Sequence, residues 1–258
     1  PDNYYVATVG NDYNVIIKCL DKTSKYQEVT IKDFNSITSV TFSSDNQYLV
    51  TRTDWYLRIY QRTNNGNWIE KQPIIEEGVE TITFSHDSRH LITFGSGSTI
   101  KRGFTPIKGK IFSRNDNGDW DNQLTCEFCC KTMNFSPDNR YVFAANSFGL
   151  DDVTAQLYKY DDNKGWIIDP SFNHDLGVET AVFSPNGQNL AISMEKGIVK
   201  IRIYGLDENK NWITKAELEN SYGLDSLTFS NDNRYLLGKT ALNQYTHRPR
   251  TIIWELAK

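Results

Sequence analysis

A ten-residue phrase recurs five times along this chain and constrains its fold more than any other feature. It reads TFSSDNQYLV, TFSHDSRHLI, NFSPDNRYVF, VFSPNGQNLA and TFSNDNRYLL, and a sixth copy opens the chain as PDNYYVATV. The shared phenylalanines are Phe42, Phe84, Phe135, Phe183 and Phe229, which stand 42, 51, 48 and 46 residues apart. A repeat with this period predicts a series of similar supersecondary units, each of which buries its apolar face against the next.

Each copy of the phrase predicts a β-hairpin. Residues alternate in polarity up to the Phe, a polar turn follows, and a second apolar strand begins, as in 39–42 and 48–50. We expect a third strand to end on a large residue and a fourth strand to start at a Trp eight residues later, after a tight turn. The third-strand residues are Tyr60, Phe112, Tyr158, Tyr204 and Trp254, and the tryptophans are Trp68, Trp120, Trp166 and Trp212. Four antiparallel strands per unit, without helical patterning between units, predict an all-β fold of the β-propeller type.

The repeats divide the chain into six units of one domain. We expect a single β-propeller domain over 1–258, with repeats near 1–36, 37–78, 79–129, 130–177, 178–223 and 224–258. The first repeat lacks its first strand and the last lacks its fourth, so two incomplete blades flank four complete ones. We therefore expect a fragment of a longer chain, and about seven blades if the ring is complete.

Composition limits the classes of partner and the cellular compartment that we expect for this protein. The 28 Lys and Arg against 32 Asp and Glu give a net charge of -4, which provides no overall positive field for nucleic acid. No apolar run approaches the roughly 20 residues of a membrane span. Four cysteines, three of them clustered, do not suit a disulfide framework and favour a reducing compartment. We expect a cytoplasmic protein that binds neither nucleic acid nor membrane.

The residues that could bind a metal have simpler structural interpretations. Cys126, Cys129 and Cys130 lack a second Cys or His pair and align with a connection between the fourth and first strands, so we expect buried or half-buried thiols. The acidic turns lack the spacing of a calcium loop, and we expect hydrogen bonding within exposed hairpins. These acids are Asp116, Asp119, Asp161, Asp162, Asp207 and Glu208. No metal and no cofactor is predicted.

The four histidines do not form a recognisable catalytic group. His86 and His90 occupy positions that other residues fill in sister repeats, and His174 and His247 stand in loops without an evident nucleophile or carboxylate partner. Motifs of serine hydrolases, P-loop proteins and zinc proteases are absent from the sequence. A non-enzymatic role is therefore the first expectation.

Several phrases resemble WD-repeat proteins, above all long divergent repeat arrays of bacteria that live inside eukaryotic cells. They are FSPDNRYV, FSPNGQNLAI, IRIY and IIWEL. The family's Gly-His pair is missing, and its Trp-Asp pair survives only as Trp254-Glu255. The resemblance implies a protein-binding propeller that acts as the targeting module of a bacterial effector, in the bacterial cytoplasm or the host cytosol.

Repeat length varies mainly in the connection between the second and third strands, which predicts a binding face there. From each Phe to its third-strand residue the interval runs 18, 28, 23, 21 and 25 residues. The resemblance places these loops on one face. The candidate partner-binding residues are Trp55, Lys101, Arg102, Phe104, Phe148, Tyr245, His247 and Arg248. We expect a non-catalytic platform for another protein, and the alternative is a propeller enzyme of the lactonase or hydrolase type with a site in the central channel.

Overall fold

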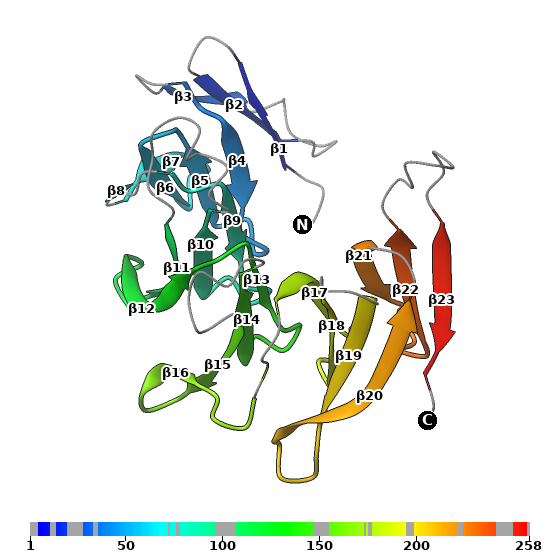
Figure 1. Ribbon diagram of the computed structural model, residues 1–258. Helices are drawn as coiled ribbons and strands as arrows, with labels where there is room; N and C mark the ends of the chain where they lie inside the picture. The colour runs from blue at the N-terminus through cyan, green and yellow to red at the C-terminus, as the bar shows by residue number, and fades with distance from the viewer. Residues whose placement is uncertain are drawn as a thin grey trace. The chain divides into compact units, whose positions relative to one another are not determined.

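The described part of the chain is made of β-strands joined by turns and short connections. The computed structural model describes residues 5–10, 14–19, 28–32, 36–71, 73–75, 78–95, 107–146, 155–172, 174, 177–194, 199–220, 224–240 and 250–256. These segments form strands β1 to β23 and contain no helix (Figure 1). The strands divide between two compact units, 1–125 and 126–258.

The first unit contains three antiparallel sheets. The first sheet is β1 (Tyr5–Val9), β2 (Asn14–Cys19) and β3 (Glu28–Lys32). The second is β4 (Ser39–Phe42), β5 (Tyr48–Arg52), β6 (Tyr56–Arg62) and β7 (Trp68–Glu70), with β8 (Ile74–Ile75) also paired to β6. The third is β9 (Thr81–Phe84), β10 (His90–Phe94), β11 (Lys108–Arg114) and β12 (Trp120–Cys129), whose last residues belong to the second unit.

The second unit contains three further antiparallel sheets. The first is β13 (Thr132–Phe135), β14 (Tyr141–Ala145), β15 (Ala155–Asp161) and β16 (Gly165–Ile168). The second is β17 (Val178–Phe183), β18 (Asn189–Met194), β19 (Val199–Leu206) and β20 (Trp212–Asn220). The third is β21 (Leu224–Phe229), β22 (Tyr235–Thr240) and β23 (Thr251–Glu255).

These sheets are the blades that the repeat predicts. In each complete sheet the strands lie side by side in chain order, which is the arrangement of a propeller blade. Four-stranded blades contain Phe42, Phe84, Phe135 and Phe183, and three-stranded sheets stand at both ends of the described chain. The predicted fold class is confirmed.

Strand ends differ from the sequence prediction by a few residues. The third strands continue past their aromatic residue, to Arg62, Arg114, Asp161, Leu206 and Glu255. The reason is the tight hairpin that follows, because it keeps the ladder paired up to the turn, as Arg62 opposite Trp68 shows. One element was not predicted: the outer strand of the second blade breaks before Pro73, which has no amide hydrogen for the ladder, and resumes as β8.

The recurring Ser and Asp fix the turn between the first two strands. In the second blade the buried Ser43 hydroxyl donates to Asp45 Oδ1 over 2.5 Å and accepts from the Tyr48 amide over 2.9 Å. Asn46 adopts a positive φ of 55°. A short polar side chain tolerates this conformation, so the turn needs no glycine. The four other repeats bond their Ser in the same way, and the positive-φ residues there are Ser88, Asn139, Gly187 and Asn233.

The repeated Phe and Trp of each blade pack together. Ring centroids lie 5.9 Å apart for Phe42 and Trp68 and 5.9 Å apart for Phe183 and Trp212. The Tyr of the preceding blade meets the same Trp edge-on, as in Tyr141 and Trp212 at 5.3 Å. Aromatic pairs prefer such tilted and edge-on arrangements. The Phe and Trp of one blade and the Tyr of the preceding blade therefore pack as a group where the two blades meet, as Phe183, Trp212 and Tyr141 do.

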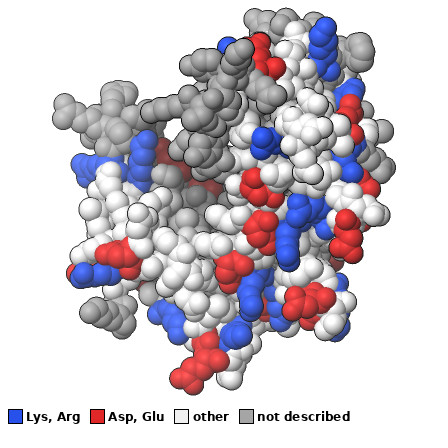
Figure 2. Space-filling view, turned by 180° about the vertical axis from the view of Figure 1, so that it is seen from behind, with Lys and Arg blue, Asp and Glu red and all other residues white. Residues whose placement is uncertain are grey.

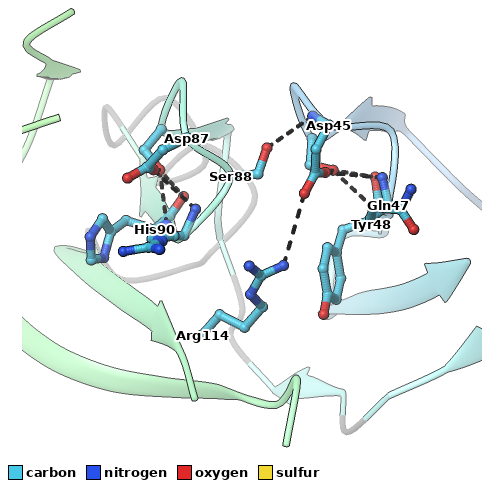
Figure 3. A network of polar contacts seen from close by, with 10 residues as sticks. Asp45, Gln47, Tyr48, Asp87, Ser88, His90 and Arg114 are labelled. Atoms are coloured by element: carbon cyan, nitrogen blue, oxygen red, sulfur yellow. Dashed lines mark hydrogen bonds and ion pairs between the residues drawn. The ribbon is translucent and has the colours of Figure 1, made fainter. Parts of the chain in front are cut away.

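Polar bridges also join neighbouring blades (Figure 3). The amide of Asp45 donates to Ser88 Oγ of the next blade over 3.0 Å. Arg114 of that blade places its guanidinium 5.1 Å from the Tyr48 ring centroid and 3.9 Å from Asp45 Oδ2. The boundary between the second and third blades therefore combines an apolar interior with polar contacts at its surface.

Candidate protein-binding surface

Trp55 is the one predicted binding residue that the described part of the chain includes. It stands in the short turn between β5 and β6, where 50% of its surface is exposed. The buried Thr53 hydroxyl accepts from the amides of Trp55 and Tyr56, over 3.2 and 3.1 Å. A large aromatic ring is thus presented from a backbone that is already ordered.

The strand that follows Trp55 is held by charged and aromatic contacts. The Arg58 guanidinium lies 4.9 Å from the Tyr56 ring centroid, and its Nη1 donates to both carboxylate oxygens of Glu70 over 2.9 Å. On the same blade β8 pairs with β6 at Tyr56 and Leu57. The turn that carries Trp55 is therefore supported by two outer strand segments.

The other predicted binding residues lie outside the described residues. They are Lys101, Arg102, Phe104, Phe148, Tyr245, His247 and Arg248. Whether they gather around one surface with Trp55 stays a prediction.

Charges of both signs are interspersed on the face in Figure 2. Lys and Arg side chains alternate there with Asp and Glu. Ion pairs between such groups occur among the described residues, as between Arg202 and Glu217 at 2.8 Å. Sequence-independent binding to nucleic acid draws its affinity from clustered positive charge. The visible face therefore gives no support to a nucleic-acid partner.

The clustered cysteines are packed against an aromatic residue. Cys126 and Cys130 are buried and Cys129 is half-buried, which confirms the predicted burial. The expected location in a connecting loop was wrong for two of them, because β12 extends through Cys129. Burial and the adjacent Cys126 thiol raise the pKa of the Tyr158 hydroxyl. Among the described residues no group of three or more His, Cys, Asp or Glu is arranged to hold a metal ion.

Two of the acidic turn residues form the hydrogen bonds that the sequence predicts. Asp161 accepts from the amides of Asn163 and Lys164, over 2.9 and 3.0 Å. Asp207 accepts from the Asn211 and Asn209 amides, over 2.8 and 2.9 Å. These amides lower the pKa of both carboxyl groups, so each carboxylate serves its own hairpin.

A Ser, an Asp and a His stand close together in the connection between β16 and β17, but their bonds are structural. The Ser171 hydroxyl donates to the buried Asp169 over 2.7 Å and accepts from the Trp212 amide of the next blade over 3.0 Å. His174 Nδ1 instead lies 2.9 Å from the Tyr204 hydroxyl. A nucleophilic triad needs the Ser and the base in contact with each other. Ser171 and His174 thus connect this blade to the next through the Trp212 amide and the Tyr204 hydroxyl. The Tyr204 partner of His174 was not foreseen from the sequence.

The remaining described histidines have ordinary packing roles. His90 is buried in β10 with Nδ1 2.7 Å from Ser113 Oγ, and burial lowers its pKa. His86 is exposed in the preceding turn. Within the described segments there is also no helix long and apolar enough to span a membrane.

The comparisons with known proteins agree with this geometry. The family described as WD domain, G-beta repeat matches residues 27–61, which cover β3 of one blade and β4, β5 and all but the last residue of β6 of the next. No curated protein sequence matched the chain.

Solved structures match almost the whole chain at low identity. Sqt1 from Chaetomium thermophilum superposes with a TM-score of 0.59 at 16% identity, covering 91% of this chain and 62% of Sqt1. A protein from Lactobacillus plantarum gives 0.57 at 15% identity, covering 100% of this chain and 82% of its own. A candidate 6-phosphogluconolactonase from Bacteroides fragilis gives 0.55 at 13% identity, covering 99% and 82%. At these identities the likeness concerns the fold alone. The chain therefore contains one stretch similar to a WD repeat, at residues 27–61, within a series of antiparallel blades, and its fold is that of a β-propeller.

Proposed function

We propose that this propeller binds another protein and does not catalyse a reaction. The observation that carries the proposal is Trp55, a half-exposed indole on a turn whose backbone Thr53 already holds in place. Trp is enriched among the residues that dominate binding energy at protein interfaces. A preordered anchor also loses little conformational freedom when it binds.

The proposed contact face includes the long connections between second and third strands. Lys101, Arg102, Phe104 and Phe148 belong to it in this proposal, as do Tyr245, His247 and Arg248. A cationic and aromatic rim around Trp55 would favour an acidic partner surface, since complementary charge accelerates association.

The proposed location is the cytoplasm, in the bacterium or in a host cell. All four cysteines are thiols in the structure, and Cys126 and Cys130 are buried, which suits a reducing compartment. The targeting role in a bacterial effector rests on the resemblance to repeat arrays of intracellular bacteria.

Photo-crosslinking tests the proposal directly. A benzoylphenylalanine at position 55 should crosslink to a protein in cell lysate, and excess unmodified protein should compete for it. The matched control places the same group at Ile69, which is 48% exposed on β7 of the same blade. Equal crosslinking at both positions, or none that unmodified protein suppresses, would contradict a binding role for the Trp55 face.

The second candidate is a propeller enzyme of the lactonase type. The fold shared with the candidate 6-phosphogluconolactonase favours it. Its test is hydrolysis of a sugar-phosphate lactone followed by proton release. A catalysed rate would replace the binding proposal, whereas a rate equal to the uncatalysed one would remove this candidate.

A further inference from the structure

Three Asn-Gly pairs stand in hairpin turns of the described chain, and this dipeptide has a reactivity of its own. They are Asn65-Gly66, Asn117-Gly118 and Asn186-Gly187. The Gly amide nitrogen attacks the side-chain carbonyl carbon of the preceding Asn, since glycine has no Cβ to hinder the approach. A cyclic imide forms as ammonia leaves, and water then opens the ring to aspartate or isoaspartate. All three Asn side chains are exposed, so exposure alone does not distinguish the sites.

Hydrogen bonds hold the Asn186 side chain away from this reaction. Its Oδ1 accepts from the Ser184 hydroxyl over 2.7 Å and from the Gln188 amide over 3.1 Å. Gly187, whose amide nitrogen is the nucleophile, is buried and donates to the Ser184 carbonyl over 2.8 Å. Ring closure requires the Asn186 side chain to rotate towards this nitrogen, and it must give up both of its bonds to do so.

The Asn117 side chain has no such bonds among the described residues, but the glycine after it is enclosed. Gly118 is buried, and a Cβ built on it would lie 3.0 Å from the Tyr48 hydroxyl and 3.3 Å from Gln61 Oε1. The Asn117 carbonyl accepts from Lys71 Nζ over 3.2 Å. The peptide unit between Asn117 and Gly118 is thus fixed against the second blade, which shields its amide from the base that must remove the proton.

Neither of these restraints acts on Asn65. Among the described residues nothing bonds to its side chain, and Gly66 is half-buried where Gly118 and Gly187 are buried. The Gly66 amide donates to the Thr63 carbonyl over 2.9 Å, and the Thr63 amide closes the turn on the Asn67 carbonyl over 2.7 Å. This turn therefore leaves the Asn65 side chain able to rotate towards the nitrogen of Gly66.

We propose that Asn65 is a site of spontaneous deamidation, and that the fold slows the same reaction at Asn117 and protects Asn186 from it. The conversion consumes one water and releases one ammonia, and it needs neither an enzyme nor an oxidant. Its product carries a new carboxylate, and the isoaspartyl form also adds one carbon to the backbone. Both changes fall in the hairpin that begins and ends with Arg62 opposite Trp68.

The chain itself supplies a matched variant for this turn. In the fifth blade Asn209 is followed by Lys210, and the turn has the same two backbone bonds. Lys210 has a φ of 61°, and Gly66 has a φ of 82°. A lysine side chain hinders attack on the preceding Asn, so Asn209 should keep its amide. Gly66→Lys copies this sequence into the second blade and should suppress the reaction at Asn65.

Peptide mass spectrometry after incubation of the folded protein at mildly alkaline pH measures each site separately. Water enriched in heavy oxygen marks the acid that forms during the incubation. We expect Asn65 to convert at least about tenfold faster than Asn186, because Asn186 must first give up two hydrogen bonds. Asn117 should fall between them. In guanidinium chloride all three Asn-Gly pairs should react at similar rates.

Equal rates at Asn65 and Asn186 in the folded protein would overturn the proposal. So would an Asn65 that keeps its amide over a time in which the unfolded chain converts. A difference between the sites that persists in guanidinium chloride would also overturn it, since the local sequence and not the fold would then set the rates. Conversion of Asn65 in Gly66→Lys at the wild-type rate would exclude the Gly66 nitrogen as the nucleophile.

Discussion

The size of one residue on the second strand, Gly238, matches the size of the aromatic residue on the third strand, Trp254. Trp254 replaces the Tyr or Phe of the four preceding repeats, and Gly238 beside it provides the space. A methyl group on Gly238 would meet Trp254 Cζ3 at 2.9 Å and Leu224 Cδ2 at 3.0 Å. Where the aromatic is Tyr158 or Tyr204, the repeats carry Ala144 or Ile192 at the position of Gly238. The larger ring and the glycine therefore belong together.

Gly238→Ala should destabilise the protein by about 1–3 kcal/mol, the usual cost of overpacking a core. In a Trp254→Tyr background the same change should cost clearly less, because the smaller ring leaves room as it does beside Ala144. Urea unfolding of the two single variants and the double variant measures this coupling. Additive effects of the two changes would show that the ring does not set the cost.

His90 occupies the position that Tyr48, Tyr141 and Tyr235 fill in other repeats, and it makes stability depend on pH. Burial lowers its pKa below the ordinary value of 6.5, so the folded protein favours neutral imidazole. As the pH falls below about 6.5 the unfolded chain binds a proton more readily than the folded one, and stability is lost. His90→Tyr should therefore lose less stability than wild type between pH 7.5 and pH 5.

Urea unfolding at the two pH values measures this difference, and His90→Gln provides a second variant if tyrosine does not fit beside Ser113. The exposed His86→Gln serves as the control and should retain the wild-type pH dependence. If His90 variants also retain it, the imidazole is not the titrating group.

The turns between the first and second strands form hydrogen bonds to the corresponding turns of neighbouring blades. The amide of Asp45 donates to Ser88, and the amide of Asn186 donates to Asn233 Oδ1 over 3.1 Å. Between the fourth and fifth blades the corresponding residue is Gly187, which has no side chain to accept a bond. A Cβ there would lie 3.6 Å from Asp138 Cγ, and the backbone already has a φ of +69°.

Gly187→Asn should restore the missing bridge and stabilise the protein by about 0.5–1.5 kcal/mol, the net value of one hydrogen bond. Asn adopts this φ at the equivalent positions 46, 139 and 233. Gly187→Ala is the control, because it adds a side chain without an acceptor; its Cβ is strained at this positive φ, so this variant should be less stable than wild type. Thermal unfolding in which Asn gains nothing over Ala would refute the bridging role of this position.

The sequence predicts the order of the strands and their grouping into blades, but it does not predict where every strand ends. The repeated Phe, Ser and Trp predict the blades because turn chemistry and alternating polarity agree in every copy. The sequence does not reveal the break before β8 or the extension of β12 through Cys129, since both depend on how far a ladder stays paired. It also does not reveal that Ser171 and His174 bond to the next blade, because those partners lie 41 and 30 residues away.

For the whole molecule, the fold could be predicted from repetition, whereas the binding site could not. Several blade boundaries within each unit repeat the same kinds of contact, such as Tyr48 with Trp120 and Tyr141 with Trp212, so one copy informs the others. Binding depends instead on what differs between repeats, and of the predicted surface only Trp55 lies within the described residues. Its position on a short turn agrees with an anchor role, which makes it the residue to test.

The affinity for the crosslinked partner tests the central claim most directly. Isothermal titration with that partner should give a dissociation constant at least about tenfold higher for Trp55→Ala than for wild type, which corresponds to about 1.4 kcal/mol. Ile69→Ala should change it less than about twofold, and both variants should keep the wild-type melting temperature, since these side chains are about half exposed. Equal affinities for wild type and Trp55→Ala would contradict the account.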